Sequence, residues 1–130
     1  MVEWQVRGIR GATTVTENTV AAMSNAVHEL LAEIEAHNLF RPQDIVCVFF
    51  TVTTDLDAMF PAAAARKRPG WDHVPLIDLQ QMHVKGSLER CIRVLIQVNT
   101  AQPQSAIVHR YLQQAQALRP DLDIQLTTNP

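Results

Sequence analysis

The 130-residue chain lacks the short motifs by which many enzymes hold a metal ion, a nucleotide or a covalent intermediate. Its five histidines show neither HxxxH nor HExxH spacing and its two cysteines form no CxxC pair, so we expect no metal site. The stretch RGIRGATT, residues 7–14, is the nearest approach to a phosphate loop, but it matches neither GxGxxG nor the Walker pattern. No serine or cysteine stands in the context of a nucleophile elbow. We therefore expect neither nucleotide binding nor covalent catalysis.

A strong charge of one sign and long apolar runs are also absent. The net charge is -2 and the pI is near 6.2, which gives no general attraction to nucleic acid or to an anionic membrane. The longest apolar runs are strand-sized, short of the ~20 residues of a membrane-spanning helix. The N-terminus, MVEWQVRGIRG, has an early acidic residue and no apolar h-region, unlike a secretory signal. We expect a cytoplasmic protein in which Cys47 and Cys91 are reduced thiols.

The length of 130 residues and the hydrophobic fraction of 47% indicate a single globular domain over residues 1–130. Apolar positions that step by three and four predict a helix over residues 18–37, and IVCVFFTV, residues 45–52, is typical of a central strand. Further strands are predicted over 3–10, ending at Gly8 and Gly11, over 73–77 and over about 89–99. Pro61 can open a short helix and Pro103 a last one, which Arg119-Pro120 would stop. The helical stripes are Val20, Met23, Val27, Leu30, Leu31 and Ile34, then Ile107, Val108, Tyr111, Leu112, Ala115 and Leu118.

The order β-α-β-(short α)-β-β-α predicts an α/β fold of the α+β kind, with one mixed sheet packed against helices. Residues 122–130 form a polar tail for which we expect mobility.

Three arginines occupy unusual positions. Arg93 lies inside the apolar strand CIRVLIQV, Arg10 follows a strand between two glycines, and Arg66 lies on the short helix. A guanidinium keeps its proton and offers a planar fork of donors that matches a carboxylate. A buried guanidinium without an anion is strongly unfavourable, so Arg93 needs a partner. Each of the three could instead be structural, Arg93 in a salt bridge or on an exposed edge and Arg10 in a loop.

Tyr111 and Asp78 are further candidates with ordinary structural alternatives. Tyr111 lies on the stripe of the predicted last helix, so it can be a core aromatic whose hydroxyl reaches the surface. Asp78 follows the predicted strand HVPLI and can be a turn or cap residue. Neither residue identifies a function alone.

Read together, six segments in order resemble the AroH-class chorismate mutases: RGIRGATTV (7–15), TTDLDAMFPAAAAR (53–66), GW with VP (70–71 and 74–75), CIRV (91–94), YL (111–112) and LRPDL (118–122). The resemblance covers nearly the whole chain. It implies a single-domain, chorismate-mutase/RidA-like fold and a homotrimer with a pseudo-barrel core and active sites between subunits. The implied reaction is the cofactor-free rearrangement of chorismate to prephenate in aromatic amino acid biosynthesis.

The resemblance also implies roles for individual residues. Arg93 would donate to the ether oxygen and to a carboxylate of the substrate, Arg10 and Tyr111 would bind a carboxylate, and Arg66 would lie near the entrance. Such a reaction needs fixed positive charge and a restricted substrate conformation rather than a general base. The remaining implied substrate-binding positions are Phe60 and Ala62 from the adjacent subunit, Leu118 and Arg119, which help to close the site, and Ala63, Ile77, Leu79 and Gln80.

The chain departs from the family pattern at two places. Where many relatives carry a glutamate, this chain has Gln81, and three residues earlier it has Asp78. Positions three apart lie on opposite faces of a strand but eclipse in a 3₁₀-like turn. We therefore expect residues 78–82 to form a tight turn, in which Asp78 supplies the negative charge and Gln81 keeps a hydrogen bond. At the cleft rim Ala63 replaces a lysine of some relatives, which should mainly raise KM.

Two other functions are compatible with these residues. One is a non-catalytic trimeric sensor of chorismate or a similar anion, and an acquired Asp78 carboxylate would count against it. The other is an imine deaminase of the RidA type, which also binds a carboxylate through an arginine. The segments RGIRGATT and LRPDL are not typical of that family.

Overall fold

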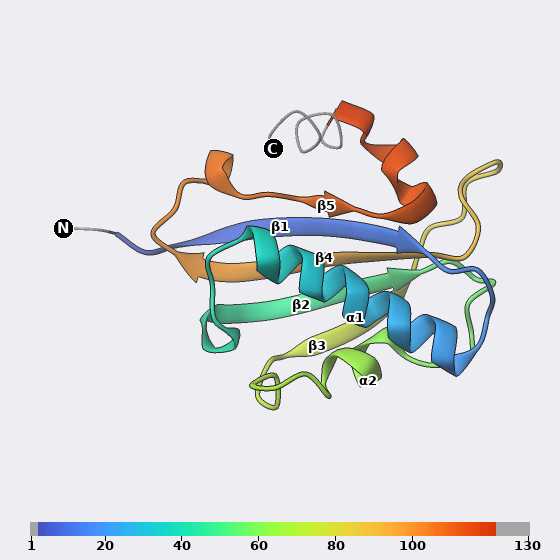
Figure 1. Ribbon diagram of the computed structural model, residues 1–130, viewed down its shortest axis with the longest axis horizontal. Coiled ribbons are helices and arrows are strands. Elements are labelled where there is room, and N and C mark those ends of the chain that lie inside the picture. The colour runs from blue at the N-terminus through green and yellow to red at the C-terminus, as the bar shows by residue number, and fades with distance from the viewer. Residues whose placement is uncertain (1–2, 122–130) are drawn as a thin grey trace.

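The computed structural model describes residues 3–121, which fold around one five-stranded mixed sheet (Figure 1). The order of strands in the sheet is β3-β2-β4-β1-β5. The pairs β1–β4 and β2–β4 are antiparallel, whereas β2–β3 and β1–β5 are parallel. The mixed sheet predicted from the sequence is confirmed. The strands are β1 (Gln5–Thr14), β2 (Ile45–Val52), β3 (Leu76–Gln80), β4 (Cys91–Thr100) and β5 (Arg110–Tyr111).

Two helices, α1 (Val20–His37) and α2 (Pro61–Ala65), lie over one face of the sheet (Figure 1). Thr19 caps α1, since its Oγ1 accepts a hydrogen bond from the Ala22 amide at 3.1 Å. The predicted apolar stripe is buried from Met23 to Ile34, but Val20 is 57% exposed in the first turn. We call this side of the sheet the covered face; its largest buried side chains include Ile9, Val48, Phe50, Ile92, Ile96 and Val98.

The first strand does not end at its glycines, as the sequence suggested, but continues to Thr14. Gly11 lies beneath α1, where an added Cβ would be 2.9 Å from Ile34 Cδ1 and 3.1 Å from the Arg110 carbonyl oxygen. This glycine therefore serves close packing of helix on strand rather than a turn. The predicted third and fourth strands are also displaced, to 76–80 and 91–100.

The predicted last helix is wrong. The chain instead forms a 3₁₀ turn at Gln104–Ala106, the short strand β5, and a second 3₁₀ segment at Gln113–Leu118. The positive φ of 52° at Gln113 breaks a regular helix. The physical reason for the extended path is the free edge of β1, whose backbone groups need partners. His109, Arg110 and Tyr111 lie along that edge, and the tail beyond Asp121 lies outside the described residues.

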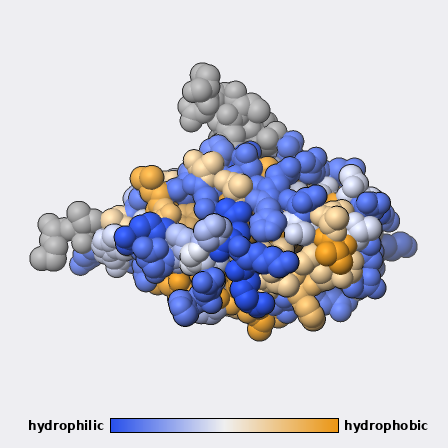
Figure 2. Space-filling model, turned by 60° about the horizontal axis from the view of Figure 1, so that its bottom comes forward, coloured by the Kyte–Doolittle hydropathy of each residue, from blue (hydrophilic) through white to orange (hydrophobic). Residues whose placement is uncertain are grey.

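The second face of the sheet, which we call the open face, is not covered by α1 or α2. Among the described residues, the 3₁₀ segment Gln113–Leu118 covers part of it, since Ala115 packs against Ala12 and Tyr111. Residues alternate along β4, so Arg93, Leu95 and Gln97 point to the open face while Ile92, Val94 and Ile96 point to the covered face. The surface on the side of β3 and α2 also carries hydrophobic patches between hydrophilic ones (Figure 2). Over residues 3–121, no helix is long and apolar enough to cross a membrane.

Candidate active site

Arg93 lies at the centre of the open face, between Ala12 of β1 and Thr51 of β2. Its Nε is buried without a hydrogen-bond partner. Within residues 3–121, the other buried side-chain polar atoms without a partner are Thr51 Oγ1 and Gln81 Oε1. An unsatisfied buried polar atom costs about 1–3 kcal/mol, and a charged group costs more. Thr51 and Arg93 pair across β2 and β4, and Gln81 directly follows β3, so these atoms mark a candidate place for a polar ligand.

The Arg93 guanidinium also influences Cys91, which lies two residues earlier on the same face of β4. Burial raises the pKa of the Cys91 thiol, and the guanidinium acts in the opposite direction. Burial is the stronger effect, so this thiol remains protonated near neutral pH. Cys47 and Cys91 are both free thiols, as expected.

Tyr111 stands in the same row of the sheet as Arg93. Ala12 pairs with Arg93 on one side and with Tyr111 on the other, so these two candidate side chains are separated by two strand spacings, about 10 Å. Tyr111 is 8% exposed and packs with Ala12, Ala115 and Leu118. It is thus a largely buried aromatic residue on a strand rather than on a helix.

Arg10 and Arg119 lie beside this row. Arg10 is exposed and pairs with Leu95 in the next row of the open face. Arg119 follows the last 3₁₀ segment, and its Nε and Nη2 donate to the Asp121 carboxylate at 3.1 and 3.0 Å. Burial and the positive charges of these two arginines lower the pKa of His109. Arg10, Arg93, Tyr111 and Arg119 form the first of two groups of predicted site residues.

The second group lies at or near a cavity of about 540 Å³ at the end of β3, which four of its members line. The loop between β2 and α2 forms one wall, with Phe60 72% exposed at its end, and Asp78, Leu79 and Gln80 form another. Asn18, which precedes α1, fixes this loop because its Oδ1 accepts the Asp57 and Ala58 amides at 3.0 and 3.1 Å. Ala62 and Ala63 belong to α2, and Arg66 directly follows it.

Asp78 does not lie in a tight turn, and this expectation is wrong. Residues 76–80 form strand β3, in which Asp78 pairs with the core residue Phe50 and therefore lies on the covered face. Its Oδ1 accepts the Ala62 amide at 3.0 Å, at the start of α2. Burial raises the pKa of the Asp78 carboxyl, and this amide together with Arg66 partly opposes the rise.

Gln81 lies on the other face from Asp78. Leu79 pairs with Thr51 in the row of Arg93, and two residues later the Gln81 amide donates to the Val52 carbonyl at 2.8 Å. Alternation therefore directs the Gln81 side chain to the open face, where Ile77 and Leu79 are also exposed. Asp78 and Gln81 therefore lie on opposite faces, so a carboxylate at position 78 does not take the place of one at position 81.

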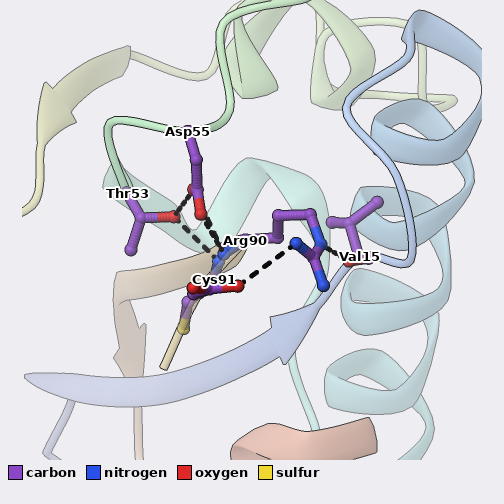
Figure 3. A network of polar contacts seen from close by, with 6 residues as sticks. Val15, Thr53, Asp55, Arg90 and Cys91 are labelled. Carbon is purple, nitrogen blue, oxygen red and sulfur yellow. Dashed lines mark hydrogen bonds and ion pairs between the residues drawn. The ribbon is translucent and has the colours of Figure 1, made fainter. Parts of the chain in front are cut away.

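A polar network that the sequence reasoning missed joins the loop before β4 to the loop after β2 (Figure 3). The Asp55 carboxylate accepts the Arg90 amide at 2.9 Å and the Thr53 hydroxyl, and Thr53 Oγ1 accepts the Cys91 amide at 3.0 Å. The Arg90 Nε in turn donates to the Val15 carbonyl at 2.9 Å. Arg90 adopts a φ of 46°, so these bonds hold a strained residue immediately before the strand of Arg93. Asp55 in the segment TTDLD was the available sequence signal, but the sequence does not show that its partner is Arg90, 35 residues later.

The described chain does not bring all the predicted residues together. The first group belongs to the open face and the β1–β5 edge, and the second lies mostly on the covered side of β3 and on α2. Within the described residues, no group of three or more metal-ligating side chains occurs.

Comparison with known proteins supports one function. The family described as chorismate mutase type I matches residues 6–122. The chain is 43% identical over 123 residues to Chorismate mutase AroH of Bacillus subtilis (strain 168), and the alignment covers 95% of this chain and 97% of the relative. It is 48% identical over 119 residues to Chorismate mutase AroH of Thermus thermophilus, with 91% and 97% covered. A solved chorismate mutase from Clostridium thermocellum superposes with a TM-score of 0.81 and 44% identity, over 85% of this chain and 97% of that one. The chain belongs to the chorismate mutase type I family.

Proposed function

We propose that the chain converts chorismate to prephenate by a cofactor-free [3,3] rearrangement, a step of aromatic amino acid biosynthesis. The observation that carries the proposal is the buried, unpartnered Nε of Arg93 beside the unpartnered Thr51 and Gln81 oxygens. Family membership supplies the substrate. Metal-free and nucleophile-free catalysis is consistent with a site built from guanidinium, hydroxyl and amide groups.

The chemistry explains why Arg93 is suited to this task. In the rearrangement one carbon–carbon bond forms while the ether carbon–oxygen bond breaks, and negative charge develops on the ether oxygen. A guanidinium cannot transfer its proton, so it offers fixed positive charge throughout the reaction. Because the strand holds Arg93 in place before the substrate binds, little reorganisation is needed in the transition state. Donation from Arg93 to the ether oxygen is therefore the central catalytic interaction.

The neighbouring residues restrict the substrate conformation. Arg10 and Tyr111 bind a carboxylate, which orients the enolpyruvyl group over the ring. Gln81, rather than Asp78, meets the ring hydroxyl, since it shares the open face with Arg93. Asp78 supports the site from behind by holding the start of α2, which carries Ala62 and its neighbour Ala63.

A homotrimer would bring the two groups of residues together. The open face exposes apolar side chains that water solvates poorly, and burial against a second copy would stabilise the assembly. Phe60 and Ala62 of one subunit would then close the site of its neighbour, while Arg66, Leu118 and Arg119 would surround the entrance. The apolar side chains concerned are Val6, Ile77, Leu79 and Leu95.

The sensor alternative keeps one supporting observation. Because Asp78 faces away from Arg93, the open face presents the neutral Gln81 where relatives carry a negative charge, so binding without fast turnover remains an alternative. The family match gives no support to the RidA-type deaminase. We retain the cytoplasm as the proposed compartment, in keeping with two free thiols.

The decisive test follows chorismate absorbance in the ultraviolet with wild type, Arg93→Lys and Arg41→Lys. Arg41 pairs with Asp44 on the surface and serves as the matched control. We expect Arg93→Lys to lower kcat by about 10²–10³-fold, since the fork of donors is lost, while Arg41→Lys stays within twofold. Equal kcat for all three proteins would reject the role of Arg93, and binding of chorismate without any turnover would establish the sensor.

A further inference from the structure

Side chains supply hydrogen-bond partners to the β1 backbone at positions that the short strand β5 does not reach. β5 has only two residues, and its backbone ladder with β1 covers Gly11 and Ala12. One step earlier, the Arg10 amide donates to Nδ1 of His109 at 2.9 Å. Two residues before that, the Gln104 side chain accepts the Gly8 amide at 3.0 Å and donates to the Gly8 carbonyl at 2.7 Å.

We infer that His109 is a positioning residue for the reaction, whose neutral imidazole replaces a strand carbonyl and fixes Arg10 against the segment that carries Tyr111 and Arg119. The inference rests on the proposed function, because it assumes that Arg10 and Tyr111 bind the substrate carboxylate. His109 itself is not placed against the substrate. It acts through the register of the two chain segments that it joins.

The bond defines the protonation state of the ring. Nδ1 can accept the Arg10 amide only when it carries no proton, so the neutral ring has its proton on Nε2. Burial and the nearby guanidinium groups of Arg10 and Arg119 lower the pKa of His109, which favours this neutral form. Two residues of α1 and its C-terminal end contact the residues next to His109. Asn38, which follows the helix and is neutral, bonds the Val108 backbone, and Glu33 pairs with Arg110 at 3.0 Å.

The position of the bond predicts which kinetic constant depends on it. His109 is adjacent to Arg110 and two residues before Tyr111, and its partner is the backbone of Arg10 itself. Loss of the bond would let these carboxylate-binding groups move relative to one another. Arg93 lies on β4, which β1 and β2 hold on both sides, so the group at the ether oxygen would stay in place. Substrate capture should therefore weaken while the chemical step is preserved.

Asparagine and glutamine separate the acceptor from the ring. In His109→Asn the amide oxygen takes the place of Nδ1, since both are bonded to the γ carbon, but it does not titrate. In His109→Gln the amide lies one carbon further out and the acceptor is misplaced. His73→Asn is the matched control, because His73 is exposed on the loop before β3.

The first measurement is the steady-state kinetics of the four proteins between pH 5.5 and 8. We expect His109→Gln to raise KM about tenfold with kcat within twofold, and His109→Asn and His73→Asn to keep the wild-type KM at pH 7.5. Protonation of His109 removes the acceptor, so the wild-type KM should rise as the pH falls, while that of His109→Asn stays flat. An equally high KM in the asparagine and glutamine variants, or identical pH profiles for wild type and His109→Asn, would overturn the inference.

A second measurement does not depend on turnover. Hydrogen exchange of the Arg10 amide, followed by NMR, should be slow in wild type and His109→Asn and at least tenfold faster in His109→Gln. Unchanged exchange in His109→Gln would overturn the inference whether or not the protein is active. Absence of chorismate turnover in wild type would reject the proposed function separately.

Discussion

Replacement of Arg93 by methionine should remove activity and increase stability at the same time. The side chain leaves Nε buried without a partner in the free protein, and such an orphaned group costs about 1–3 kcal/mol. Methionine has a similar length, adapts to irregular space and has no polar hydrogen to satisfy. We therefore expect Arg93→Met to raise the free energy of unfolding by about 1–3 kcal/mol, a gain in Tm of about 3–9 °C for a chain of this size.

The activity of Arg93→Met should change in the opposite direction. Loss of the donor at the ether oxygen is expected to lower kcat by about 10²–10³-fold or more. The two assays are thermal unfolding monitored by circular dichroism and loss of chorismate absorbance. Arg41→Met is the control: the Arg41 side chain is 66% exposed and pairs with Asp44, so its loss should lower the free energy of unfolding by about 1 kcal/mol at most and leave kcat unchanged. A lower Tm for Arg93→Met would refute the reasoning, because it would mean that the guanidinium is satisfied in the free protein.

Other positions give further predictions. Asp78→Asn keeps the acceptor for the start of α2, so kcat in the absorbance assay should stay within about twofold. A large loss of kcat would contradict the position of Asp78 on the covered face. Gln81→Glu should raise kcat several-fold in the same assay, because it adds a negative charge on the open face. Gly11→Ala should destabilise the fold by about 1–3 kcal/mol in denaturant unfolding, since the added Cβ meets α1 and a carbonyl oxygen. Asp55→Ala should cost about 1–3 kcal/mol by the same measurement, and an unchanged stability would show that its bonds to Arg90 contribute nothing.

Stability should also depend on pH through His109. The pKa of this residue is lowered in the folded protein from its ordinary value of 6.5, so the unfolded chain binds the proton first. The contribution of the neutral ring is therefore present above about pH 6.5 and is lost as the pH falls below it. Thermal unfolding of His109→Asn should show a smaller loss of Tm than wild type between pH 7 and 5.5, and parallel losses would contradict this linkage.

Regular periodicity made part of the fold predictable from the sequence. A helix was expected over residues 18–37, and is present as α1 (Val20–His37), because Met23, Val27 and Ile34 repeat at helical spacing and nothing interrupts them. The strand of Arg93 was equally clear from its alternating apolar residues. Both elements are long, and their hydrophobic pattern agrees with the surface against which they pack.

The C-terminal part could not be predicted in this way. Ile107, Tyr111 and Ala115 are buried as a helical stripe would have them, but they reach the core from 3₁₀ segments and a short strand. The open edge of β1 decided the conformation, and that edge becomes visible only once β1 and β4 are paired. The same limitation applies to Asp78, since a position after HVPLI is a turn or a strand depending on its pairing with β2.

The candidate site has a weak sequence signal for a chemical reason. Fixed positive charge and substrate conformation can accelerate a rearrangement without a nucleophile, a base or a metal, so each residue type involved also has common structural uses. Arg68, for example, is a structural arginine, because it donates to Glu35 at 2.7 Å. Arg93, inside β4, differs from it because its buried Nε has no hydrogen-bond partner within the described residues. The proposed distinction between a structural and a catalytic arginine in this fold therefore lies in unsatisfied hydrogen-bonding capacity, which is a property of the folded sheet and not of a motif.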